Sequence, residues 1–127
     1  MVLMDRNEIV SRIEETGFVG VIRMKDAGKL TRVIEAVSEG GLRALEITMT
    51  TPGALDLIKE VSGQVGEDFL LGAGSVLDPE TARQAILAGA EFIVSPISKR
   101  ELIEMGHRYD KPVIPGAFTP TEVLTAW

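Results

Sequence analysis

Leu42-Arg-Ala-Leu-Glu-Ile-Thr48 is a short, mostly apolar stretch that ends in a carboxylate and a hydroxyl. Two glycines, Gly40 and Gly41, precede it and the turn-forming residues 50–53 follow it, so it is predicted to be a strand. Because apolar residues dominate, we expect both faces of this strand to be covered, as in a parallel sheet flanked by helices. Glu46 is the exception, since a buried carboxylate is costly unless it is paired or hydrogen-bonded. Glu46 is therefore a candidate for function.

The same alternation of strand and helix extends along the whole chain. The predicted strands are residues 18–22, 42–48, 68–72, 91–94 and 111–114. The predicted helices begin near Asp5, Asp26, Thr51-Pro52, Asp78-Pro79, Ser98 and Thr119-Pro120. Strict alternation implies a parallel sheet with right-handed crossovers. Two architectures fit this pattern, an open doubly wound sheet and part of a (β/α)8 barrel. A helix before the first strand suits the barrel, because such a helix would cap the barrel's bottom.

The composition narrows the class of protein. The 127 residues suit one domain, spanning residues 1–127, and 45% hydrophobic residues can form a real core. A net charge of -6 without a basic stripe argues against nucleic acid as a partner. With no cysteine and one histidine, His107, we expect no metal site. No membrane span and no signal peptide are visible, so we expect a cytoplasmic protein with no membrane partner.

Candidate site residues follow from the strand ends, because both architectures place chemistry at the carboxyl ends of the strands. Glu46 could act as a general base, since burial raises the pKa of a carboxyl group toward neutrality. The alternative is a structural ion pair with Arg23 or Arg43. Arg23 could hold a substrate carboxylate or phosphate through its planar guanidinium, or it could be an ordinary surface arginine.

The segment Gly72-Ala-Gly-Ser75 would let backbone N–H groups approach a ligand closely, and Ser75 adds a hydroxyl. It is neither a Walker loop nor a dinucleotide fingerprint, because the residues that complete those motifs are missing. A tight turn between strand and helix is the alternative. The turns Ser95-Pro96 and Pro115-Gly116 have ordinary turn chemistry. None of the lysines falls at the carboxyl end of a predicted strand, where a catalytic amine would be expected.

Four motifs in one order and spacing are specific. They are Gly40-Gly41 before Leu45-Glu-Ile-Thr48, Gly72-Ala-Gly-Ser-Val-Leu77, Ala88-Gly-Ala-Glu-Phe-Ile-Val-Ser-Pro96, and Ile114-Pro-Gly-Ala-Phe-Thr-Pro-Thr-Glu122. Together they resemble the 2-keto-3-deoxy-6-phosphogluconate (KDPG) / 4-hydroxy-2-oxoglutarate aldolase family over nearly the whole chain. The resemblance implies a TIM-type (β/α)8 barrel, usually trimeric, of which this chain supplies five βα units preceded by a helix.

The resemblance also implies a class I aldolase that needs no cofactor. In that family a lysine forms a Schiff base with the keto carbon of pyruvate, and the protonated imine accepts electrons as the C3–C4 bond breaks. Glu46 matches the family's proton-transfer glutamate, and Ser75 takes the place of the hydroxyl that holds the pyruvate carboxylate. The residues expected to contact substrate are Arg23, Thr48, Gly74, Ser75 and Pro96. Thr50 stands where some members have a further arginine.

Three functions remain open at this stage. The family's lysine lies on a sixth strand, in a Lys-Phe-Phe-Pro-like segment, and its phosphate site is built by loops after strands 7 and 8. The favoured hypothesis is a parent aldolase, a homotrimer whose lysine lies beyond Trp127, with a keto acid such as pyruvate or a phosphorylated sugar acid as its ligand. The alternative is an inactive barrel fragment that self-associates through its edge strands or only binds small keto acids. A third hypothesis, another phosphate-handling barrel such as an epimerase, is disfavoured by the four motifs.

Overall fold

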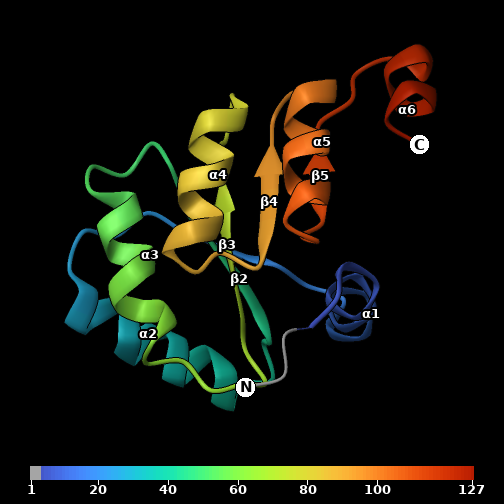
Figure 1. The fold of residues 1–127 in the computed structure, drawn as a ribbon. Helices are drawn as coiled ribbons and strands as arrows, with labels where there is room; N and C mark the ends of the chain where they lie inside the picture. The colour runs from blue at the N-terminus through green and yellow to red at the C-terminus, as the bar shows by residue number, and fades with distance from the viewer. Residues whose placement is uncertain (1–3) are drawn as a thin grey trace.

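The computed structural model describes residues 4–127, in which five parallel strands alternate with helices (Figure 1). The strands are β1 (Gly20–Ile22), β2 (Ala44–Thr48), β3 (Leu70–Gly74), β4 (Phe92–Ser95) and β5 (Val113–Pro115). The helices are α1 (Arg6–Thr16), α2 (Ala27–Glu39), α3 (Ala54–Ser62), α4 (Pro79–Ala88), α5 (Arg100–Arg108) and α6 (Pro120–Ala126). The alternation expected from the sequence is confirmed.

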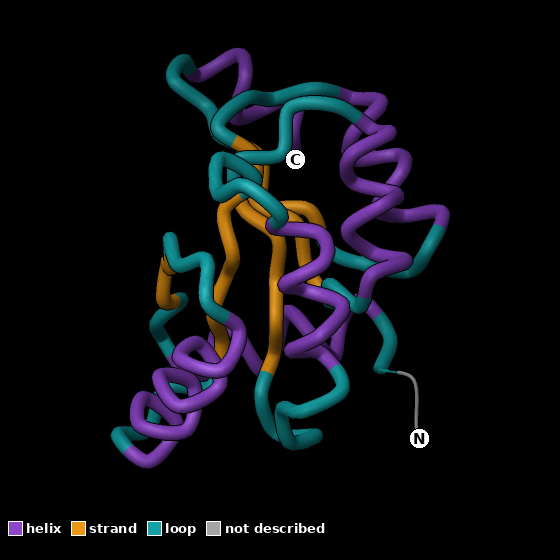
Figure 2. The backbone as a smooth tube through the Cα atoms, turned by 90° about the vertical axis from the view of Figure 1, so that its left-hand side faces the viewer, coloured by secondary structure: helices purple, strands orange, loops and turns teal. Residues whose placement is uncertain are grey.

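The strand order decides between the two architectures. The sheet runs β1-β2-β3-β4-β5, and every neighbouring pair is parallel. A doubly wound sheet reverses its order at a switch point, whereas the wall of a barrel keeps the chain order. Figure 2 shows these strands side by side with the helices packed along them. The fold is therefore part of a (β/α)8 barrel, and β1 and β5 are its edge strands.

Two apolar clusters cover the two faces of the sheet. The larger cluster joins Leu45 and Ile47 of β2 to residues of α2, α3, α4 and α5, such as Leu30 and Leu102. The smaller cluster joins Ala44, Leu70 and Phe92, on the other face, to Ile9 of α1. Figure 1 accordingly shows α1 on the opposite side of the sheet from α2 and α3. Since side chains alternate along a strand, Glu46 and Thr48 share the face of Ala44.

Two predicted helix starts are wrong. Thr51 does not cap α3, because Gly53 takes the N-cap position in the left-handed conformation (φ 74°) and the helix begins at Ala54. Thr51 is buried in the preceding turn instead, where its N–H donates to the Thr48 carbonyl at 3.0 Å. Ser98 does not cap α5 either, since Lys99 is the N-cap residue and makes no side-chain cap bond. The helix starts predicted near Asp5, Asp26, Asp78 and Thr119 are confirmed, and each of these side chains caps its helix.

The third strand also differs from its predicted bounds. It was expected at residues 68–72, and it lies at Leu70–Gly74, so the glycines extend the strand instead of forming a turn. Its residues pair with β2 from Leu70 to Gly74. Pairing with a buried neighbour on each side overrides the low strand propensity of glycine. Within residues 4–127, no helix is long and apolar enough to cross a bilayer.

Asp78→Ala is expected to destabilise the fold by about 1 kcal/mol, the usual cost of losing an N-cap. The Asp78 carboxylate accepts from the Thr81 N–H at 2.6 Å and from the Thr81 hydroxyl at 2.9 Å. The backbone hydrogen bond in particular lowers the pKa of Asp78. The Asp78 carboxylate therefore stabilises the fold at pH values above its pKa in the unfolded chain. This contribution is lost as the pH falls through the lower pKa that Asp78 has in the folded protein. Thermal unfolding should separate variant from parent at pH 7 and not at pH 2; an equal gap at both would contradict the cap.

Candidate functional site

The carboxyl edge of the sheet brings the predicted site residues together. Glu46 lies in β2, where its register partners are Val21 of β1 and Gly72 of β3. Thr48 ends the same strand opposite Gly74, and Arg23 directly follows β1. Ser75 directly follows β3 and Pro96 directly follows β4. Residues distant in the sequence thus gather at one edge of the sheet because all five strands are parallel.

Glu46 is a buried carboxylate without a fixed charged partner. It is 6% exposed, and burial raises the pKa of its carboxyl group, an effect that the charge of the exposed Arg23 partly offsets. In the part of the chain that the structure describes, no ion pair or hydrogen bond joins this carboxylate to Arg23 or Arg43. Arg43 instead donates to the Ser38 carbonyl at 2.6 Å and to its hydroxyl at 2.9 Å. The geometry therefore favours a reactive carboxyl group over a structural ion pair.

Gly74 lies against this carboxylate where β3 ends. A Cβ built on Gly74 would lie 2.5 Å from Cδ of Glu46, so the carboxylate occupies the space that a side chain would need. Ser75 follows in the left-handed region with φ 58°, which is strained for a residue other than glycine. Strain of this kind is often kept at functional sites. The turn thus places a half-buried serine directly after the glycine that packs against the carboxyl group.

The Thr48 hydroxyl is engaged within its own turn. Its Oγ1 lies 2.9 Å from Oγ1 of Thr50 and 3.5 Å from Oγ1 of Thr51. Thr48 is 1% exposed, whereas Thr50 is exposed at the rim. The three hydroxyls form a polar cluster beyond Glu46, in which Thr50 has the most direct access to solvent.

Pro96 lies at the same rim and is exposed. The turn that carries it is held by the Gly116 N–H, which donates to the Ser95 carbonyl at 2.7 Å. A Cβ on Gly116 would lie 2.5 Å from the carbonyl carbon of Pro96, so the β4 and β5 turns touch through their backbones. The buried Ser95 hydroxyl accepts from the Ile97 N–H at 3.3 Å. The contacts with Gly116 fix the position of Pro96 relative to the end of β5.

The described lysines lie outside the strands. Lys25 and Lys99 are in loops that follow β1 and β4, whereas Lys29 and Lys59 are in helices and Lys111 precedes β5. No lysine in residues 4–127 therefore projects from a strand beside Glu46, which agrees with the expectation from the sequence.

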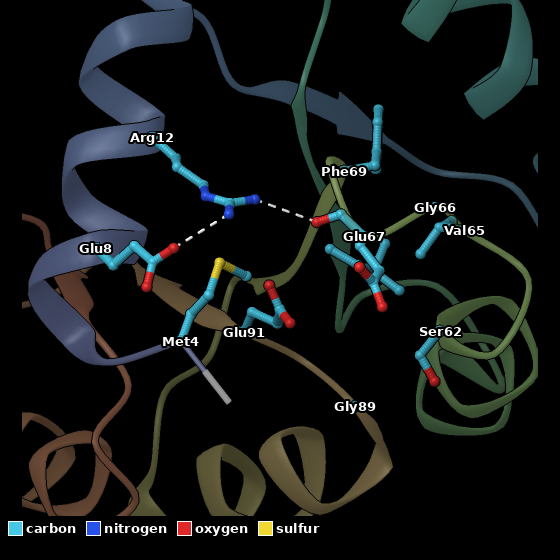
Figure 3. A pocket seen from close by; sticks show the side chains of 11 residues that line it. Met4, Glu8, Arg12, Ser62, Val65, Gly66, Glu67, Phe69, Gly89 and Glu91 are labelled. Carbon is cyan, nitrogen blue, oxygen red and sulfur yellow. Dashed lines mark hydrogen bonds and ion pairs between the residues drawn. The ribbon is translucent and has the colours of Figure 1, made fainter. Parts of the chain in front are cut away.

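The cavity in Figure 3 lies at the other end of the sheet and is distinct from this site. It measures about 200 Å³ and is lined by α1 and by the segments that lead into β3 and β4. Arg12 donates to the Glu8 carboxylate at 3.1 Å and to the Glu67 carbonyl at 3.2 Å. In the described part of the chain, the buried Oε2 of Glu91 has no hydrogen-bond partner. This end carries a cost in stability, and the predicted site residues lie at the opposite edge of the sheet.

Glu91→Gln is expected to raise the melting temperature at pH 7 by a few degrees, because it removes a charge whose burial opposes folding. Burial raises the pKa of Glu91, although Lys111 and Arg12 counteract it. A raised carboxyl pKa favours folding below the unfolded pKa and opposes it as the pH rises through the folded value. The difference in melting temperature between Glu91→Gln and the parent, measured by circular dichroism, should therefore vanish near pH 4. Glu67→Gln, at an exposed position beside the same cavity, is the control; a lower melting temperature for Glu91→Gln at pH 7 would contradict the account.

Sequence reasoning missed two features of the site. The packing of the Glu46 carboxylate on Gly74 depends on the register between β2 and β3, which no local pattern specifies. The hydroxyl cluster of Thr48, Thr50 and Thr51 was obscured because Thr51-Pro52 has the pattern of a helix start. The run of threonines directly after a buried strand was the signal that could have identified the cluster.

Comparison with known proteins gives the family that the chain matches. Residues 9–127 match the family model described as KDPG and KHG aldolase. The chain is 36% identical over 119 residues to the 2-dehydro-3-deoxy-phosphogluconate aldolase of Treponema pallidum, with 94% of this chain and 55% of that protein covered. The chain thus spans about half the length of such relatives.

Two solved structures have the same fold over most of the chain. One is a KDPG aldolase from Legionella pneumophila with pyruvate captured as a covalent carbinolamine intermediate, with a TM-score of 0.78, 32% identity, and coverage of 85% of this chain and 52% of that one. The other is the 2-keto-3-deoxy-6-phosphogluconate aldolase of Zymomonas mobilis with 3-phosphoglycerate, with a TM-score of 0.81, 30% identity, and coverage of 93% and 56%.

Proposed function

Because the chain belongs to the KDPG and KHG aldolase family, we propose that its protein is a class I aldolase. It cleaves 2-keto-3-deoxy-6-phosphogluconate, 4-hydroxy-2-oxoglutarate or both, and releases pyruvate and an aldehyde. The observation that carries the proposal is Glu46, a buried carboxyl group with a raised pKa at the carboxyl edge of a barrel sheet. A carboxyl group of this kind both accepts and donates protons near neutral pH, which the chemistry requires.

The reaction needs an amine as well as a carboxyl group. A lysine amine adds to the C2 carbonyl of the substrate, and loss of water from the carbinolamine gives a protonated imine. The C3–C4 bond then breaks as the C4 hydroxyl loses its proton, and the bonding electrons move into the imine to form an enamine. Glu46 shuttles the protons at the carbinolamine and enamine steps. Protonation of C3 and hydrolysis of the imine release pyruvate and free the amine.

We place this lysine beyond Trp127, on the family's sixth strand. The position of the described lysines supports the placement, because none of them projects from a strand beside Glu46 in residues 4–127. Lys25 and Lys99 lie in loops at the carboxyl edge of the sheet, where Glu46 also lies. They are therefore the alternative positions for the reactive amine within this chain. Mapping the modified lysine after covalent trapping separates the two possibilities.

The substrate's anionic ends have candidate partners in this chain. We propose that Ser75 holds the pyruvate carboxylate, with Gly74 and Thr48 beside it, and that Pro96 lines the pocket. Arg23 then contacts the far anionic end, where its exposed guanidinium can reach a carboxylate or a phosphate. The strained Ser75 turn and the shared edge of the sheet support this arrangement.

We also propose a homotrimer in the cytoplasm, as the family resemblance implies. Light scattering of the protein expressed from its complete coding sequence should give three times the chain mass, and a monomer would contradict the trimer.

The activity is tested by measuring pyruvate release from each of the two substrates, with the protein expressed from its complete coding sequence. Turnover of at least one substrate is expected, and it should persist in EDTA because the amine, and not a metal ion, withdraws the electrons. Failure to cleave either substrate would refute the proposed function. Turnover that EDTA abolishes would refute the class I mechanism.

A further inference from the structure

The Glu46 carboxylate lies over the Cα of Gly74 on the neighbouring strand. Glu46 is paired in register with Gly72, so its side chain reaches two residues further along β3. A Cβ on Gly74 would collide with Oε1 of Glu46, would lie 2.5 Å from its Cδ and 3.2 Å from its Oε2. The carboxylate and a side chain at position 74 therefore exclude each other.

The backbone at this position does not itself require glycine. The φ angle of Gly74 lies outside the left-handed region, and its carbonyl accepts from the Met49 N–H at 2.8 Å in an ordinary strand contact. Glycine within a strand often marks a place where another group approaches closely. At Gly74 that group is the Glu46 carboxylate, so the missing side chain provides space for it.

The contact also accounts for how the carboxylate is held. In residues 4–127 no hydrogen bond or ion pair fixes the Glu46 carboxylate, so packing determines its position. The space over Gly74 is therefore what defines the position of the carboxylate.

We propose that Gly74 is a positioning residue whose missing side chain holds the Glu46 carboxylate in its reactive place. The proposal rests on the proposed aldolase function and deepens it, because Gly74 then acts on the proton-transfer group as well as beside the substrate. A methyl group at position 74 would force the carboxylate out of this place. We expect the fold to tolerate the change, since the three atoms nearest to the methyl group all belong to the end of the flexible Glu46 side chain.

Gly74→Ala is the direct test, in the protein expressed from its complete coding sequence. We expect kcat to fall at least about 10-fold with KM changed less than about threefold, because small misplacements of a reacting group are costly. In the Glu46→Gln background the same change should cost less than about twofold, since coupled residues do not act additively. If Gly74→Ala lowers kcat as much in the Glu46→Gln background as in the parent protein, the proposal is overturned. An unchanged kcat in Gly74→Ala alone would also overturn it.

A matched control lies two residues earlier on the same strand. A Cβ on Gly72 would lie 2.7 Å from Cδ2 of the Phe92 ring, in the core and away from the carboxylate. Gly72→Ala should therefore lower the melting temperature more than Gly74→Ala does. It should leave the titration of Glu46 close to that of the parent protein.

The titration of Glu46 gives a readout that does not depend on activity. Carbon-13 NMR of the side-chain carboxyl groups, assigned by the signal that Glu46→Gln removes, should give a lower pKa for Glu46 in Gly74→Ala than in the parent, because displacement from its packed position makes the group less buried. An unchanged titration, or an equal shift in Gly72→Ala, would overturn the positioning role. Absence of turnover in the parent protein would instead refute the aldolase function, and the titration would still decide the role of Gly74.

Discussion

Glu46→Gln is expected to lower kcat for pyruvate release at least about 100-fold, the usual scale for loss of a general acid–base group. Glutamine keeps the shape of the side chain and can occupy the space over Gly74, but it cannot transfer the proton. KM should change less, because Arg23 and Ser75 are the residues proposed to bind the substrate's anionic ends. Steady-state kinetics on both substrates measure the effect.

The same variant should remain folded. Burial raises the pKa of the Glu46 carboxyl group, so the ionised form opposes folding near neutral pH, and a neutral glutamine removes that cost. Its melting temperature at pH 7 should therefore equal or exceed that of the parent. Glu101→Gln, at an exposed position in the first turn of α5, is the matched control and should keep full activity. Turnover of Glu46→Gln near the parent level would show that the carboxylate is only structural.

Phe92→Ala is expected to lower the free energy of unfolding by about 3–5 kcal/mol, the range for truncating a buried aromatic side chain. Phe92 is fully buried between the sheet and α1, where it packs with Ile9 and Leu70. Its ring lies over Gly72, its register partner on β3, so no neighbouring side chain at that position can fill the space that it leaves. Folded domains are stable by only about 5–15 kcal/mol, so the loss is a large fraction of the total.

Urea unfolding followed by circular dichroism measures this loss, and Phe18→Ala is the matched control. Phe18 is 74% exposed in the segment between α1 and β1, so its truncation should change stability by less than about 0.5 kcal/mol. Equal losses for the two variants would contradict the core position of Phe92. A large loss confined to Phe92→Ala would support the packing of α1 against the face of the sheet that carries Phe92.

The features that local sequence patterns specify were predicted well. Helices were expected to begin near Asp26, Asp78 and Thr119, and each of these residues caps its helix with its own side chain. The buried strand around Glu46 was recognised from its apolar residues and its flanking turns. These predictions succeed because a cap or a strand depends on neighbours within a few residues.

The features that depend on tertiary contacts were not predictable in the same way. The alternation of elements left the doubly wound sheet and the barrel both open, and only the strand order separates them. Thr51 has the pattern of a cap but is buried under the turn that follows β2. The contact between Glu46 and Gly74 depends on the register of two strands, so it becomes visible only once the sheet has formed.

The central claim is that this protein works through a Schiff base with pyruvate, and covalent trapping tests it most directly. The protein expressed from its complete coding sequence is incubated with pyruvate and borohydride, and its intact mass and peptides are measured. The account predicts one reduced pyruvate adduct per chain, on a single lysine beyond Trp127. An unchanged mass would contradict the class I mechanism, and an adduct on Lys25 or Lys99 would contradict the proposed place of the nucleophile.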